Sequence, residues 1–314
     1  MATYTSSTAI GEREDLSDVI YRIDPDETPL VSNSQKETTK GIFHEWQVQE
    51  LAAAVDTNYV NEGADYSYAN PSPTTRLGNY HQISVQAASV SNTLDVVDKA
   101  GRDKETAYVK VLKGLEQRRD IEKSLFKNEA RSASDPRKAA KLITWITNVD
   151  KPSDMAAATG DGSDTADLTG TAAALTLAKI DAAMLAAYTD GGSPNMLLMS
   201  PTNKQNFSGL SSGSVATNQI TMTAPKEASI IGSVSLYLSD FGELSVTVDR
   251  QCPNSEMYLI DTDYVCLGSL PGRMFSVSDV ASTGDATKFA IVSEWTLIVK
   301  APKAHAAVIG LDGS

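Results

Sequence analysis

The sequence predicts an α+β fold, because helix-forming and strand-forming patterns occupy different parts of the chain. Residues 103–129 contain no proline, and their apolar side chains recur at helical spacing, at Tyr108, Val111, Leu112 and Leu115. From residue 230 onward the pattern changes to short strand-like runs, of which 289–299 is the longest. We therefore expect one long helix that lies as a strut across a sheet.

The chain is acidic apart from this helix. Its 314 residues include 27 Lys or Arg against 40 Asp or Glu, a net charge of −13, which disfavours non-specific binding to nucleic acid or anionic membranes. Residues 97–131 hold ten basic against seven acidic side chains. The helix charges that we single out are Lys110, Lys113, Arg118, Arg119 and Lys123. They either cover a solvated helix face or meet acidic neighbouring copies or packaged DNA, and the sequence leaves both open.

Cysteine content and hydropathy suggest a protein made in the cytosol. Cys252 and Cys266 are too few for a disulfide framework in a chain of this length, so we interpret them as reduced thiols. No apolar run is long enough to span a bilayer, and residues 1–8 lack the charged and apolar regions of a secretory signal. We therefore expect neither membrane association nor export.

The first ninety residues indicate an arm followed by a long hairpin. Residues 1–41 are polar and interrupted by prolines, which is typical of an extended arm that lies on another surface. Residues 43–49 and 82–87 alternate with period two, and we predict that these two strands pair. About thirty polar residues lie between them, a length that is typical of a functional or disordered loop. Tyrosines in and beside this loop suit a contact surface, with a mobile solvated loop as the alternative.

The rest of the chain alternates between helices, loops and strands. Residues 142–146 form a short apolar element, and residues 150–174 show no periodicity. We predict a helix over 175–189, a buried strand over 196–199, a helix from Pro201 to Phe207, and a loop over 208–226. Further strands are predicted over 234–238, 244–248, 257–260, 265–267 and 304–309.

No pattern in the sequence indicates catalysis, a metal or a cofactor. There is no Walker sequence and no G-x-G-x-x-G after a strand. Residues 160–167 resemble a calcium loop but lack its ligand spacing. His44 and His81 would approach each other if their strands paired, but packed or solvated histidines are the better interpretation, and His305 is isolated. An enzyme whose site is built from scattered carboxylates is one alternative that stays open.

Seven short stretches, in order along nearly the whole chain, carry a family resemblance. They are 13–20 with Thr28-Pro29, 44–47, 97–102, 118–122, 199–201, 204–205 and 303–306. Together with the element order, they resemble the major capsid proteins of tailed bacteriophages with the Hong Kong 97-type (HK-97-like) fold, in the branch of SU-10-like major head proteins. The resemblance implies an N-arm, an E-loop hairpin, a long spine helix, a P-domain sheet and an A-domain. The parts expected here are 1–42 (N-arm), 43–92 (E-loop hairpin), 93–149 (P-domain part with spine helix), 150–254 (A-domain) and 255–314 (P-domain return strands).

The resemblance also implies a function and partners. Copies would form hexamers and pentamers that close into an icosahedral or prolate head shell around double-stranded DNA, without sequence-specific binding, after assembly in the host bacterial cytoplasm. A portal at one vertex, a separate scaffold protein and, where present, a cement protein would be its partners. Contacts between copies are expected from the E-loop and the N-arm, at Asp15, Tyr21, Tyr59, Glu62, Asp65, Tyr66, Tyr68 and Arg76.

Two further expectations concern locking and an alternative role. Some relatives crosslink an E-loop lysine to a neighbour's asparagine, but no lysine occurs here between Lys40 and Lys99, so we predict non-covalent locking. A β-rich tail or surface component of a phage is the alternative, and it should lack the spine helix.

Overall fold

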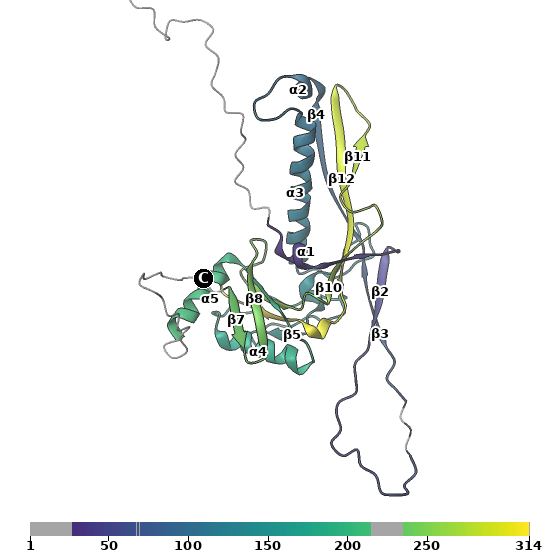
Figure 1. Ribbon diagram of the computed structural model, residues 1–314, viewed down its shortest axis with the longest axis vertical. Helices are drawn as coiled ribbons and strands as arrows, with labels where there is room; N and C mark the ends of the chain where they lie inside the picture. The colour runs from purple at the N-terminus through teal and green to yellow at the C-terminus, as the bar shows by residue number, and fades with distance from the viewer. Residues whose placement is uncertain (1–26, 67, 69, 215–234, 314) are drawn as a thin grey trace, which may run out of the picture.

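A computed structural model describes residues 27–66, 68, 70–214 and 235–313 (Figure 1). Its strands form a five-stranded sheet, a six-stranded sheet and a two-stranded hairpin. The long helix runs beside the five-stranded sheet, while the hairpin loop projects away from the body (Figure 1). The predicted combination of helices and sheets is therefore confirmed.

The longest strand, β12 (Ala286–Val299), organises the five-stranded sheet. Along one edge it pairs antiparallel with β4 (Gln82–Ser91) over ten residues. Its other edge is shared by β10 (Val265–Ser269) and β11 (Ser276–Val280), and β1 (Gln35–Thr38) adds to β10 in parallel. The second half of β12, residues 293–299, is buried. This predicted strand therefore connects the five-stranded sheet to the interior of the subunit.

The predicted strut is α3 (Glu105–Leu125), which lies along β4 and β12 (Figure 1). The side chain of Gln117 donates a hydrogen bond to the Ser84 carbonyl at 2.8 Å, and Ile121 and Leu125 are buried. The N-terminal half of α3 differs from the prediction, because Val111 on the expected apolar face is 63% exposed. Among the described residues, it is the C-terminal half of α3 that packs into the body of the subunit (Figure 1).

The three central strands of the six-stranded sheet, β13, β9 and β6, are buried on both faces. Its strand order is β5-β13-β9-β6-β8-β7. Leu197 and Met199 of β6 (Met196–Met199) pack in one core with Met184 of α4 (Leu177–Thr189). Met196 and Leu198 face a second core that also receives α3 and the five-stranded sheet. Burial on both faces explains why β6 is a continuous apolar run.

The remaining elements complete these layers. They are α1 (Pro29–Asn33), α2 (Asn92–Val96), η2 (Leu142–Trp145), β5 (Asn148–Asp150), α5 (Pro201–Ser214), β7 (Leu236–Ser239), β8 (Gly242–Val248), β9 (Glu256–Ile260), η3 (Pro302–Ala304) and β13 (Ala306–Ile309).

The predicted hairpin partner is wrong. The strand β2 (Phe43–Val48) pairs with β3 (Thr75–Tyr80), a strand that the sequence pattern did not predict. The segment 82–87 belongs to β4, which pairs with β12 instead. Period-two alternation identifies the two faces of a strand but not its partner, and β4 forms its ten ladder pairs with β12.

Other differences follow from weak local patterns. Residues 208–214 continue α5, although they were expected to be a loop. The strands β1 and β11 were missed because they are short and mostly polar or exposed. The strands predicted within 255–314 divide between the sheets: β10 and β12 join the five-stranded sheet, as does the unpredicted β11, while β9 and β13 join the six-stranded one.

Candidate assembly surfaces

The loop between β2 and β3, residues 49–74, presents apolar side chains to solvent. Its large exposed side chains are Leu51 (97% exposed), Val55, Tyr59, Val60, Tyr66 and Tyr68 (93% exposed). The loop also carries four acidic residues and no Lys or Arg. A concentration of exposed apolar groups on one projecting segment is typical of a surface that contacts another protein.

The root of the hairpin, in contrast, is fixed to the body. Trp46 of β2 packs on Trp145 of η2, with ring centroids 5.3 Å apart. The buried Asn79 of β3 donates to the Leu297 carbonyl at 2.8 Å and accepts from the Ala140 N–H at 2.8 Å. These contacts hold the two strands while leaving the loop free of core packing.

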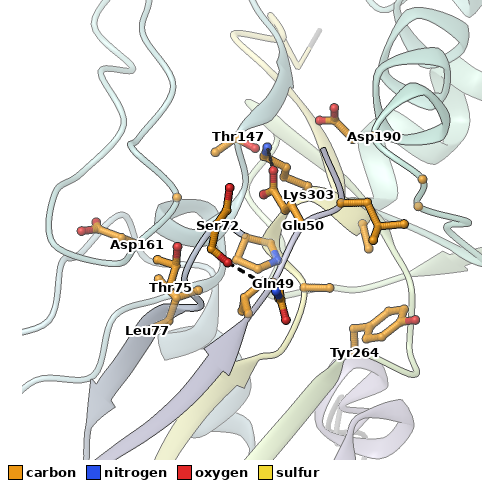
Figure 2. Close-up of a pocket in the computed structure, with 18 of the residues that line it drawn as sticks. Gln49, Glu50, Ser72, Thr75, Leu77, Thr147, Asp161, Asp190, Tyr264 and Lys303 are labelled. Atoms are coloured by element: carbon orange, nitrogen blue, oxygen red, sulfur yellow. Dashed lines mark hydrogen bonds and ion pairs between the residues drawn. The ribbon is translucent and has the colours of Figure 1, made fainter. Parts of the chain in front are cut away.

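A cleft of about 1120 Å³ lies between the hairpin root and the segments at the end of α4 and around η3 (Figure 2). One ion pair crosses it, with Lys303 Nζ 2.7 Å from Glu50 Oε2. The hydrogen bond with Glu50 raises the pKa of Lys303. Figure 2 shows Asp161, Asp190 and Tyr264 around the cleft as well, and no histidine or cysteine lines it. The lining therefore offers polar anchoring groups but no nucleophile paired with a base.

The predicted charges of α3 fall into two groups. Lys110 lies 3.5 Å from Asp279 of β11, and Lys113 lies 2.5 Å from Glu116. Arg118 donates to the Ser32 hydroxyl at 2.7 Å. The side chains of Arg119 and Lys123 form no hydrogen bond or ion pair with any described residue, and of the five singled-out charges they are the two left for an external partner.

The predicted contact residues are exposed wherever the structure describes them. Tyr59, Tyr66 and Tyr68 are at least 80% exposed, and Glu62 and Asp65 lie in the same exposed loop. Arg76 of β3 instead pairs with Glu45 of β2 at 3.5 Å. Asp15 and Tyr21 lie outside the described residues. The structure therefore brings the hairpin residues to one surface, and their contacts remain predictions.

The histidines are packed. His81 is buried and hydrogen-bonds the Thr39 hydroxyl at 2.9 Å, and burial lowers its pKa to about 4. His305 is fully buried, which likewise lowers its pKa to about 4. His44 stacks on Trp46. The part of the chain that the structure describes holds no cluster of His, Cys, Asp and Glu that could bind a metal, and no helix suited to crossing a bilayer.

Buried acidic side chains connect distant parts of the chain, and the sequence analysis missed them. Glu294 of β12 is 3.1 Å from both Arg137 and Arg273. Glu122 of α3 accepts hydrogen bonds from the backbone N–H groups of Leu30 and Val31, at 2.6 and 2.8 Å. Because these partners are far apart in the sequence, no local pattern could have identified them.

Comparison with solved structures shows which class of protein has this architecture. The capsid asymmetric unit of cyanophage A-1(L) matches with a TM-score of 0.69 at 14% identity, over 96% of this chain and 97% of that chain. The SrpI encapsulin of Synechococcus elongatus PCC 7942 matches with a TM-score of 0.59 at 12% identity, over 100% of this chain and 98% of that chain. The fold is therefore the HK97-like fold of shell-forming proteins.

Sequence comparison identifies the family. The model of the SU10 major capsid protein family matches residues 2–312, and the chain belongs to this family. Members of this family are major capsid proteins, which are structural proteins of the phage head shell. The chain is also 31% identical to the major capsid protein of Escherichia phage Phieco32 over 122 residues. This match spans 39% of the chain and 35% of the length of the Phieco32 protein.

Proposed function

We propose that copies of this chain assemble into hexamers and pentamers that close into a head shell around double-stranded phage DNA. The observation that carries this proposal is the projecting loop at residues 49–74, whose apolar side chains find no partner surface within the described part of the chain. Within this role α3 is the spine helix, and the β2–β3 hairpin is the E-loop that overlies a neighbouring copy. The part boundaries at residues 42, 92, 149 and 254 stay predictions.

The charge distribution supports a shell that does not adhere to its DNA. The net charge of −13 opposes non-specific binding to a polyanion, so no sequence-specific or tight DNA contact is expected. Arg119 and Lys123 are available for acidic surfaces of neighbouring copies. A portal at one vertex, a separate scaffold protein and a cement protein belong to this proposal as partners of the shell.

Locking between copies is proposed to be non-covalent. The hairpin has no lysine from residue 41 to residue 98, so it carries no amine for an isopeptide bond. The exposed tyrosines and aliphatic side chains of the loop would supply apolar contact area instead.

Sedimentation and negative-stain electron microscopy of the purified full chain test the assembly. We expect capsomers that convert to closed shells. A monomer that stays at 33.5 kDa under all conditions tried would contradict the proposal. Denaturing electrophoresis of the shells tests the locking separately, because single-subunit bands are expected and a ladder of subunit multiples would contradict it.

A further inference from the structure

Two buried carboxylates meet where the N-terminal segment, α3 and the end of β8 come together. Glu122 of α3 and Asp249, the residue after β8, are both 0% exposed. Neither forms an ion pair with a Lys or Arg of the described residues. A buried carboxylate without a cation is costly when it is ionised, so a pair of them needs a physical explanation.

Hydrogen bonding shows what one of these carboxylates does. The two Glu122 oxygens accept the N–H groups of Leu30 and Val31, which lie in the first turn of α1. No side chain at the N-terminus of α1 caps these N–H groups, so Glu122 takes that role from another helix. Glu122 therefore helps to hold the segment 28–34 on the body, together with the burial of Leu30 and Val31 in the core.

The other carboxylate has one unsatisfied oxygen. Asp249 Oδ1 accepts the Gln251 N–H at 2.7 Å, but the buried Asp249 Oδ2 has no hydrogen-bond donor in the structure. A proton on Glu122 would supply this donor and remove one of the two negative charges. Burial, together with the hydrogen bond and the charge of Asp249, raises the pKa of Glu122 to about 8, against the opposing effect of the two N–H groups.

The surrounding groups add no positive charge. Cys252, which precedes β9, lies close enough to interact with Glu122, Asp249 and Glu256, and Tyr258 interacts in turn with Cys252 and Glu256. Burial raises the pKa of Cys252, Glu256 and Tyr258, and Glu256 accepts a hydrogen bond from the Tyr258 hydroxyl. Arg118, one turn before Glu122 on α3, is directed to Ser32. These surroundings therefore favour the protonated, neutral form of Glu122.

We propose that Glu122 and Asp249 share one proton and that this proton holds the root of the N-terminal segment, residues 28–34, on α3. With the proton present, Glu122 donates to Asp249 Oδ2 and still accepts from α1. When the proton leaves to solvent, two buried negative charges face each other and the segment detaches. The anchor belongs to the folded subunit, so it does not depend on shell formation.

The direction of the pH dependence follows from linkage. The folded-state pKa of Glu122, about 8, lies above its ordinary value of 4.5. The anchor is therefore strongest below pH 4.5, weakens as the pH rises above that value, and is lost above about pH 8. Within this window the equilibrium constant for detachment rises by up to about tenfold per pH unit.

Hydrogen exchange of the unassembled full chain at about pH 6 and about pH 8 tests the anchor, with exchange corrected for its intrinsic pH dependence. We expect protection of the peptide 28–34 to fall by about tenfold or more, while that of β6 stays unchanged. Asp249→Asn should abolish this fall, because its amide can donate to Glu122 without a shared proton. Asp261→Asn is the matched control, since Asp261 is also buried and caps residue 263 in the same way.

Two results would overturn the proposal: wild-type protection that does not change with pH, or an Asp249→Asn variant that loses protection as the wild type does. If Asp249→Asn does not fold, infrared spectroscopy of the wild type decides. A protonated carboxyl C=O band that is present at neutral pH, disappears by about pH 9 and is missing in Glu122→Gln supports the shared proton. The absence of such a band in the wild type, or a band that Glu122→Gln leaves unchanged, contradicts it.

Discussion

The central strand β6 of the six-stranded sheet buries its apolar side chains, whereas the hairpin loop exposes its apolar side chains to solvent. Met196–Met199 of β6 is at most 3% exposed, whereas Leu51 and Tyr68 of the loop are more than 90% exposed. Burying one large apolar side chain contributes about 1.5–3 kcal/mol. Burial of the β6 side chains stabilises the subunit itself. The loop side chains would contribute this free energy only when a neighbouring copy covers them. On the proposed function, apolar side chains therefore serve folding in one region and assembly in the other.

The largest effect is expected from a cavity in the body. Trp295 of β12 is fully buried, donates to the Ser84 hydroxyl at 3.0 Å and lies under the Lys141 ammonium. Trp295→Ala should lower the free energy of unfolding by about 3–5 kcal/mol. Urea unfolding of the unassembled chain measures this. An unchanged urea midpoint would mean that burial in the interior does not stabilise the subunit, and the contrast between the interior and the loop would fail.

Close packing beside the cleft gives the next prediction. A Cβ on Gly192 would lie 2.6 Å from Ala304 Cα and 2.7 Å from its carbonyl oxygen. Because backbone atoms cannot move aside as a side chain can, Gly192→Ala should destabilise the fold by about 1–3 kcal/mol. Thermal unfolding of the variant beside the wild type measures this, and equal melting temperatures would refute it.

Gly114, in the middle of α3, should respond with the opposite sign. A Cβ there meets no atom within 4 Å, so alanine fits without strain. Glycine costs about 1 kcal/mol relative to alanine within a helix, so Gly114→Ala should stabilise the fold by about that amount. A lower midpoint in the same urea series would show that this position needs glycine for a reason other than space.

The loop should show the smallest effect on folding. Tyr66 and Tyr68 are exposed and make no core contact, so replacing both with serine should change the free energy of unfolding by less than about 0.5 kcal/mol. Urea unfolding of the unassembled double variant tests this. A loss comparable to that of Trp295→Ala would mean that the loop packs on its own subunit.

Local periodicity predicted the elements whose pattern reflects their burial. The helices α3 and α4 and the strands β6 and β12 were found in this way. The strand β1, with the sequence Gln-Lys-Glu-Thr, carries no such pattern, because it is held by its ladder with β10 and not by an apolar face. The partner of β2 was wrong for a related reason: alternation does not encode which strand lies alongside.

The assembly surface was predictable only in part. The tyrosines of the loop were singled out because tyrosine offers apolar contact area with a polar tip, and the structure places them in solvent. The Glu122–Asp249 pair and the ion pair between Glu50 and Lys303 were not found. Each joins residues that only the folded chain brings together.

The central claim is that the loop at residues 49–74 serves assembly and not folding. The most direct measurement is electron microscopy and sedimentation of the Tyr66→Ser/Tyr68→Ser variant under conditions in which the wild type forms shells. We predict a variant that is folded, with an unfolding midpoint like that of the wild type, but fails to form closed shells. Normal shells from this variant would contradict the account, because the exposed aromatic surface would then have no role in joining the copies.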